Sequence, residues 1–176
     1  IRFPLGAYYY QGGKYQDFTI FYIARYAPDP SYNTSGVITG LTNQNQEIFR
    51  DIDSNWYTGF GDGYIGRSYH NNWVYQDPQA VGNISGLNNI YDWWLGTSTK
   101  NKLRINTIEQ TTNYYSSNSS HWTSPNRFCI NDGYGNNSAW DVAELIYFNR
   151  LLGYSEIKGV ERYLNAKYFN VYTEPE

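Results

Sequence analysis

Charged residues, cysteine, methionine and long apolar runs are all scarce or absent in this sequence of 176 residues. Charged residues make up 16% of it, against roughly 25% in an average soluble protein. The formal net charge is −3, and no run of Lys or Arg occurs. Nucleic acids and anionic membranes attract proteins through basic patches, so we expect neither as the main partner. No stretch approaches the roughly 18 apolar residues of a membrane-spanning helix, so we expect no membrane insertion.

Cys129 is the only cysteine of the chain. It cannot form a disulfide within the chain, and it lacks the partners of a zinc site. Because it lies in the apolar stretch Arg127–Ile130, we expect a buried structural thiol. The chain begins at Ile1 and contains no Met, which we interpret as a processed product or an excised piece of a longer protein.

Aromatic residues, in contrast, are abundant. They make up 19% of the chain and include 20 Tyr and 6 Trp. Hydrophobic residues reach 40%, which is enough to build a core in which tyrosine supplies much of the buried area. No linker composition and no repeat of fixed period divides the sequence. We therefore expect one domain over residues 15–176, preceded by an extended arm or edge strand over residues 1–14.

Short strands are predicted along most of the chain. Asp17–Tyr26 is rich in β-branched and aromatic residues and predicts a long buried strand. Further segments with strand character are separated by Asn, Asp and Gly: Val37–Leu41, Glu47–Arg50, Trp56–Phe60, Tyr64–His70, Trp73–Tyr75, Tyr91–Gly96, Lys102–Asn106, Arg127–Ile130 and Trp140–Asn149. Many short strands with regular turn signals are typical of an all-β sandwich or barrel.

The C-terminal stretch has a different period. Apolar residues recur there at steps of three and four, which predicts a helix over Tyr154–Lys167. Ile157, Val160 and Leu164 would dock this helix. We expect it to cover one end or edge of the sandwich.

The same C-terminal segments carry a family resemblance. Trp140–Arg150 and the positions that follow it resemble the closing strand and helix of laminin-G-type domains: Leu152, Glu156, Ile157, Val160, Tyr163, Leu164, Lys167 and Tyr168. Phe18–Tyr26 resembles the early core strand of these domains. Residues that resemble the middle part of their sequence are Asn55, Trp56, Gly59, Gly63, Tyr64, Trp73 and Trp94–Gly96. These domains belong to the concanavalin A-like lectin/glucanase superfamily. The resemblance spans roughly residues 15–170 and implies a two-sheet antiparallel jelly roll. We expect the Trp140–Asn149 strand to be central in it.

This fold carries lectins, adhesion modules, structural spacers and hydrolases, so the function must be sought in particular residues. The glucanases of the superfamily hold paired acids in a Glu-x-Asp-x-x-Glu pattern. The nearest match here is Glu47–Asp53, in which Phe49 replaces the middle acid. Asp141 and Glu144 are three residues apart, so they fall on opposite faces of a strand. The sequence therefore predicts no enzymatic activity, and a divergent hydrolase is the least favoured hypothesis.

A calcium site is weakly indicated. Asp51, Asp53 and Asn55 have the spacing that begins a calcium-binding loop, but Trp56 stands where such loops need glycine. An acidic turn before the Trp56 strand is the favoured interpretation. Because laminin-G-type domains often hold a calcium ion at a loop rim, the resemblance keeps calcium as a candidate cofactor.

Ligand or interface candidates are aromatic residues in polar surroundings: Tyr69, His70, Trp73, Tyr114, Tyr115 and Trp122. Their rings suit either stacking on sugar rings or contact with another protein. Four sequons, which begin at Asn33, Asn83, Asn118 and Asn136, are candidate glycosylation sites and fit an extracellular or cell-surface glycoprotein. Roughly three sequons would arise from this composition by chance.

The N-terminal arm alternates, with Ile1, Phe3, Leu5 and Ala7 on one face. It would either complete its own sheet or add a strand to a neighbouring molecule. We expect a non-catalytic extracellular module, an adhesive or structural subunit of a surface assembly or filament. Its partners would be other copies of itself or surface proteins. The alternative is a carbohydrate-binding module whose partners are glycans.

Overall fold

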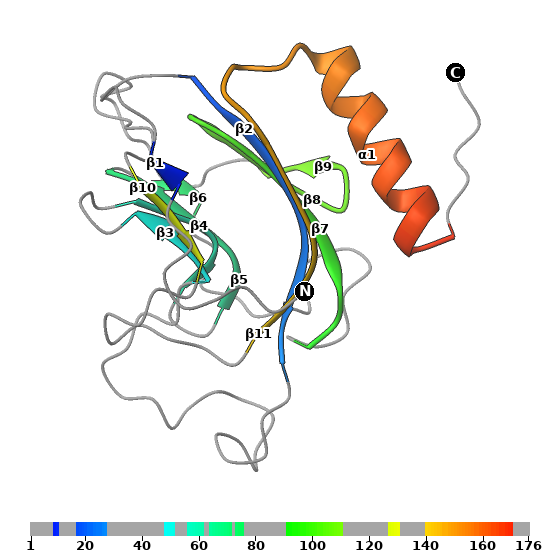
Figure 1. The fold of residues 1–176 in the computed structure, drawn as a ribbon, viewed down its shortest axis with the longest axis horizontal. Helices are drawn as coiled ribbons and strands as arrows, with labels where there is room; N and C mark the ends of the chain where they lie inside the picture. The colour runs from blue at the N-terminus through cyan, green and yellow to red at the C-terminus, as the bar shows by residue number, and fades with distance from the viewer. Residues whose placement is uncertain are drawn as a thin grey trace.

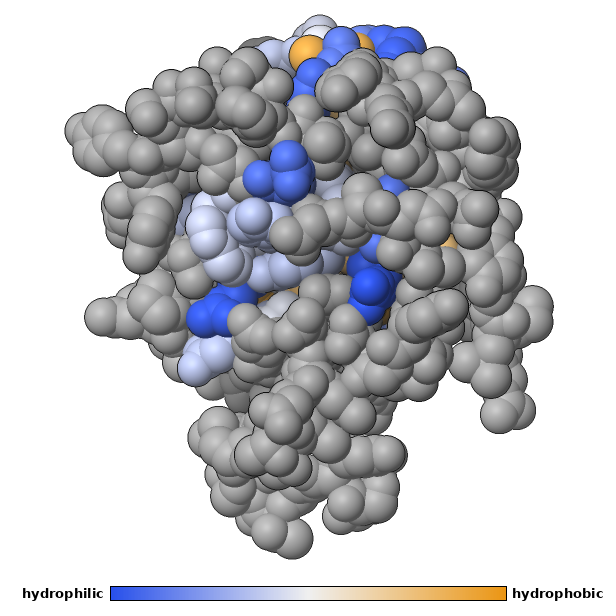
Figure 2. Space-filling model, turned by 90° about the vertical axis from the view of Figure 1, so that its left-hand side faces the viewer, coloured by the Kyte–Doolittle hydropathy of each residue, from blue (hydrophilic) through white to orange (hydrophobic). Residues whose placement is uncertain are grey.

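The computed structural model describes residues 9–10, 17–27, 48–51, 56–61, 64–71, 73–75, 91–110, 127–130 and 140–170. Two antiparallel β-sheets lie face to face in this part of the chain, and a helix covers the outside of one of them (Figure 1). The expected all-β sandwich with one C-terminal helix is confirmed. Figure 2 turns the molecule so that the outer face of the other sheet meets the viewer.

The first sheet has six strands in the order β1-β10-β3-β4-β5-β6. Their bounds are Tyr9–Tyr10 for β1, Arg127–Ile130 for β10, Phe49–Asp51 for β3, Trp56–Gly61 for β4, Tyr64–His70 for β5 and Trp73–Tyr75 for β6. The second sheet has five strands in the order β11-β2-β7-β8-β9. Their bounds are Trp140–Phe148 for β11, Thr19–Tyr26 for β2, Trp94–Thr99 for β7, Lys102–Ile105 for β8 and Ile108–Glu109 for β9.

Early and late strands pair with each other, as in a jelly roll. β1 pairs with β10, and β2 pairs with β11, both antiparallel. The expectation that the Trp140–Asn149 strand is central was wrong, because β11 is the end strand of the described five-stranded sheet. Most of its side chains are only half-buried, whereas β2 and β7 are buried along nearly their whole length. The alternation of apolar residues in β11 therefore reflects a strand at the end of its sheet.

Most predicted strands agree with the described strands to within one or two residues, but β9 was not predicted and β7 is shifted. β7 begins at Trp94 instead of Tyr91 and continues through the polar residues Thr97–Thr99. These residues pair with β2 on one side and β8 on the other, so tertiary pairing outweighs their turn-like composition. The predicted strand Val37–Leu41 lies outside the described residues.

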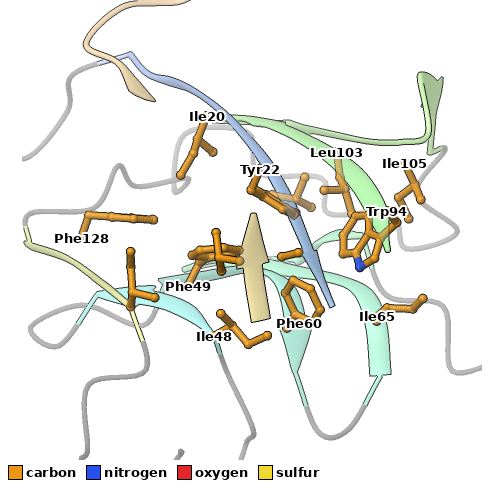
Figure 3. Close-up of a cluster of buried hydrophobic side chains, with 14 of the residues drawn as sticks. Ile20, Tyr22, Ile48, Phe49, Phe60, Ile65, Trp94, Leu103, Ile105 and Phe128 are labelled. Carbon is orange, nitrogen blue, oxygen red and sulfur yellow. The ribbon is translucent and has the colours of Figure 1, made fainter. Parts of the chain in front are cut away.

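The main core fills the space between the sheets. Side chains of β2 alternate, so that Ile20, Tyr22, Ala24 and Tyr26 face this core while Phe21 and Ile23 face the helix. Figure 3 shows Tyr22, Phe49, Phe60 and Trp94 gathered between the two sheets. Cys129 is buried as predicted.

Two glycines make room for the Tyr22 ring. Gly96 is the cross-strand partner of Tyr22, and a Cβ atom there would lie 2.0 Å from Tyr22 Cε2. On the opposite sheet, a Cβ atom at Gly59 would lie 2.1 Å from the Tyr22 hydroxyl oxygen. Gly59 also has φ +80°, a conformation that favours glycine. The phenol thus reaches from one sheet to the backbone of the other.

The helix α1 (Tyr154–Tyr168) lies against the outer face of the five-stranded sheet (Figure 1). The prediction that it covers an end or edge of the sandwich was therefore wrong. Phe21, Ile23 and Leu95 point outward from that sheet and need an apolar cover. Ile157 and Leu164 supply it together with the partly buried Val160, as predicted.

A buried ion pair also fixes this helix to the sheet. The Glu161 carboxylate is fully buried and accepts hydrogen bonds from Arg104 Nε at 2.8 Å and from the Thr97 hydroxyl at 2.9 Å. A buried charge is tolerated when it is paired and hydrogen-bonded. Because Thr97 lies on β7 and Arg104 on β8, the pair holds α1 in one register over both strands.

Gly96→Ala should lower the free energy of unfolding by roughly 1–3 kcal/mol, because the added methyl group overpacks the Tyr22 site. Gly159→Ala is the matched control. Position 159 is helical, and apart from its chain neighbours and the backbone of the helix itself no atom lies within 4 Å of the new Cβ, so this change should raise stability by about 0.5–1 kcal/mol. Urea unfolding of both variants tests the prediction. A neutral Gly96→Ala substitution would show that Tyr22 does not need this space.

Leu164→Ala should lower the free energy of unfolding by roughly 2–5 kcal/mol, since the Leu164 side chain is fully buried between α1 and the five-stranded sheet. Tyr163→Ala, next to it on the exposed side of α1, should change stability by less than about 0.5 kcal/mol. Thermal and chemical unfolding of the two variants give the comparison. Equal losses in both would contradict the docking of α1 by its apolar face.

Candidate functional site on the six-stranded sheet

An aromatic cluster lies on the outer face of the six-stranded sheet. Tyr57 of β4 and Tyr69 of β5 are direct cross-strand partners, and their rings stack with centroids 6.2 Å apart. Trp73 of β6 meets the Tyr69 ring edge-on at 5.0 Å and the Tyr57 ring at 6.2 Å. Three neighbouring strands thus bring three aromatic side chains together.

Strand alternation explains why these rings face outward. Trp56 and Thr58 flank Tyr57 and point into the sandwich, as do Ser68 and His70 on either side of Tyr69. The inner hydroxyl groups of Thr58 and Ser68 are 2.9 Å apart and hydrogen-bonded, which fixes the register of β4 on β5. The outer pair Tyr57–Tyr69 is held by the same register.

Two arginines lie on the same face. Arg67 of β5 places its guanidinium carbon 4.2 Å from the centre of the Tyr64 ring, a cation–π contact. Arg50 alternates with the inward-facing Phe49 in β3, so it points outward. Figure 2 shows weakly hydrophilic side chains gathered over this sheet, with strongly hydrophilic ones beside them.

The position of Arg67 depends on a β-bulge. Gly59 pairs with Arg67 and Phe60 pairs with Ile65, so Gly66 is an extra residue in β5. Gly66 has φ +84°, which suits a glycine at a bulge. The bulge lets Ile65 stay in the core while Arg67 turns to the outer face. Without it, the period of two would put both side chains on one face.

Two of the predicted ligand residues are in this site. Tyr69 and Trp73 are half-buried members of the cluster and lie in β5 and β6, both of which were predicted as strands. His70 was predicted as an exposed partner, and this was wrong: its side chain is fully buried and faces the core. The other ligand candidates, Tyr114, Tyr115 and Trp122, lie outside the described residues, as do Asn33, Asn83, Asn118 and Asn136.

His70 is surrounded by apolar rings inside the sandwich. Its ring stacks on Trp56 at 4.9 Å, and Phe18 contacts it edge-on at 5.7 Å. Its Nδ1 atom forms a hydrogen bond of 2.8 Å with the carbonyl oxygen of Lys100. Burial lowers the pKa of the imidazole to about 4, although the bond to the Lys100 carbonyl opposes this shift.

The structure does not support Asp51 as a calcium ligand. Asp51 is the last residue of β3, is fully buried, and is paired on both sides, with Trp56 and with Phe128. It therefore lies within the sheet instead of in a loop. Asp53 and Asn55 lie outside the described residues. Within the described ranges, no group of three or more His, Cys, Asp or Glu side chains could hold a metal ion.

Tyr57, Tyr64, Arg50 and Arg67 were missed as site residues by the sequence analysis. Their strands were predicted, so alternation could have placed Tyr57 on the same face as Tyr69. The signal for Arg67 was Gly66, because a glycine inside a strand often marks a bulge. No local signal shows that Tyr57, Tyr69 and Trp73 meet, because this depends on which strands pair.

No protein-family model and no curated protein sequence matches this chain, so the laminin-G resemblance remains a prediction. In the part of the chain that the structure describes, no helix is long and apolar enough to span a membrane.

Proposed function

We propose that the protein is a non-catalytic extracellular module that binds a glycan on the outer face of its six-stranded sheet and so attaches to a surface. The cluster of Tyr57, Tyr69 and Trp73 carries this proposal. The C–H faces of a sugar ring pack on aromatic rings, and its hydroxyl groups bond to polar groups beside them. Arg50, which is half-buried, lies on the same face, as does Arg67, which is buried beside Tyr64.

The rigid mounting of the cluster favours binding. Each ring comes from a strand that is paired with its neighbour, so the rings keep their relative positions without a ligand. Contacts among the rings restrict their rotamers further. A preorganised site loses less conformational entropy when the ligand binds.

A filament built through the N-terminal arm has less support. Tyr9 and Tyr10 of this arm pair with β10 of the same chain. Ile1, Phe3, Leu5 and Ala7 lie outside the described residues. The extracellular location rests on the resemblance to laminin-G-type domains, and the four sequons, hardly more than chance gives, are compatible with it.

Trp73→Ala and Tyr69→Ala should each weaken glycan binding roughly 30-fold, the effect of losing an aromatic anchor at the centre of a binding site. A glycan array identifies the ligand of the intact protein, and titration calorimetry then compares the variants. Tyr163→Ala removes an exposed tyrosine from α1, on the opposite side of the sandwich, and should leave affinity unchanged. Circular dichroism confirms that each variant is folded.

Two results would contradict the proposal. In one, the folded protein binds no glycan on the array. In the other, a glycan binds but Trp73→Ala and Tyr69→Ala have no more effect than Tyr163→Ala.

A further inference from the structure

The buried His70 links the candidate site to the opposite sheet. It belongs to β5, between Tyr69 of the aromatic cluster and the turn that leads to β6. Its hydrogen-bond partner, Lys100, lies in the turn between β7 and β8 of the five-stranded sheet. This bond therefore joins the end of β5 to the other half of the sandwich.

The site of His70 suits only the neutral imidazole. A carbonyl oxygen only accepts hydrogen bonds, so the Lys100 bond assigns the proton to Nδ1. Nε2 is buried and has no hydrogen-bond partner among the described residues. Protonation would add a second N–H group and a positive charge at that atom, facing aromatic rings. A buried donor without an acceptor is costly, and so is an unpaired buried charge.

The charged and titratable groups around His70 do not offset this cost. On β3, Asp51 is separated from His70 by Trp56, which pairs with both residues. The β7–β8 turn contributes Lys100, a cation, and β11 contributes Tyr147, whose ring stacks on Phe18.

The remaining neighbours add no anion on the inner side. Arg67, on the same strand as His70, is on the outer face, and Asp17, next to Phe18, is exposed. On β10, the inward residues are Phe128 and Ile130.

Movement of His70 would reach the aromatic cluster directly. The pair Trp56–His70 and the pair Tyr57–Tyr69 are successive rungs of the same ladder, one facing the core and the other facing outward. Asn71 follows His70 with φ +61°, in the turn that sets the position of Trp73. A shift of β5 at His70 therefore displaces the rings of Tyr69 and Trp73.

We propose that His70 makes ligand binding on this face acid-sensitive. The neutral ring holds β5 against the opposite sheet. Its protonation separates β4, β5 and β6, the last three strands of the six-stranded sheet, from the opposite sheet and releases the ligand. This regulation rests on the proposed function, since the ligand is the glycan of that site.

The direction of the pH effect follows from the pKa of His70 in the closed form, where the ring is buried, and in the open form, where it is exposed. An exposed histidine has a pKa of 6.5, whereas the pKa of buried His70 is about 4. The open form therefore binds the proton more readily between these values, and opening becomes more favourable as pH falls from 6.5 toward 4. The opening equilibrium should rise about 20-fold between pH 7 and pH 5.

Hydrogen exchange tests this without a ligand. Amide exchange is measured at pH 7 and pH 5 in the full chain and corrected for intrinsic rates. We expect the amides of β4, β5 and β6 to open about 20-fold more at pH 5, while those of α1 and β2 stay protected. His70→Gln should abolish the change, and His121→Gln, which removes the other histidine, should retain it. A uniform increase over all strands and α1, or no increase at all, would overturn the proposal.

A second measurement covers the case in which His70→Gln does not fold. His121→Gln leaves one histidine, whose ring protons can be titrated by NMR in the folded protein. An apparent pKa below 5 supports the proposal, and an ordinary value of 6 to 7 overturns it. Binding of the array glycan at pH 7 and pH 5 completes the test. Absence of binding at pH 7 would refute the proposed function and with it the release of a glycan, while the hydrogen-exchange test of the acid-induced opening would still stand. Equal binding at both pH values would refute the regulation and leave the proposed function intact.

Discussion

The contact of the Tyr22 ring with two glycines sets how closely the two sheets approach. The ring lies on Gly96 of its own sheet, and its hydroxyl reaches Gly59 of the other. Trp94 and Phe49 pack around it at 5.2 and 4.7 Å. A Cβ atom at either glycine would collide with this ring. The positions of β4 and β5, and with them the outer face that carries Tyr57 and Tyr69, depend on this fit.

The two sheets use their outer faces differently. The five-stranded sheet points apolar side chains outward and is covered by α1, through Leu164 and the buried pair Arg104–Glu161. The described part of the six-stranded sheet has no such helix, and aromatic and arginine side chains lie there instead. One face is thus covered by a helix, and the other carries the aromatic cluster on which the proposed function rests.

Local sequence patterns were sufficient for most strands and for α1, because β-branched alternation and the helical period are short-range signals. They could not place β11 at the end of its sheet, nor α1 on a face instead of an edge, since both depend on pairing between distant segments. They also failed at His70. Its polar neighbours suggested an exposed ligand-binding residue, whereas alternation along β5 turns its side chain into the core. Simple alternation also fails at Arg67, because the bulge at Gly66 turns this side chain to the outer face while Ile65 stays in the core.

The central claim is that the aromatic cluster of the six-stranded sheet holds the ligand. NMR contacts between the protons of a bound array glycan and the aromatic ring protons of the protein test it most directly. We predict intermolecular contacts to the indole of Trp73 and to the ring of Tyr69. Contacts confined to other rings, such as the exposed Tyr154 and Tyr163 of α1, would contradict the account.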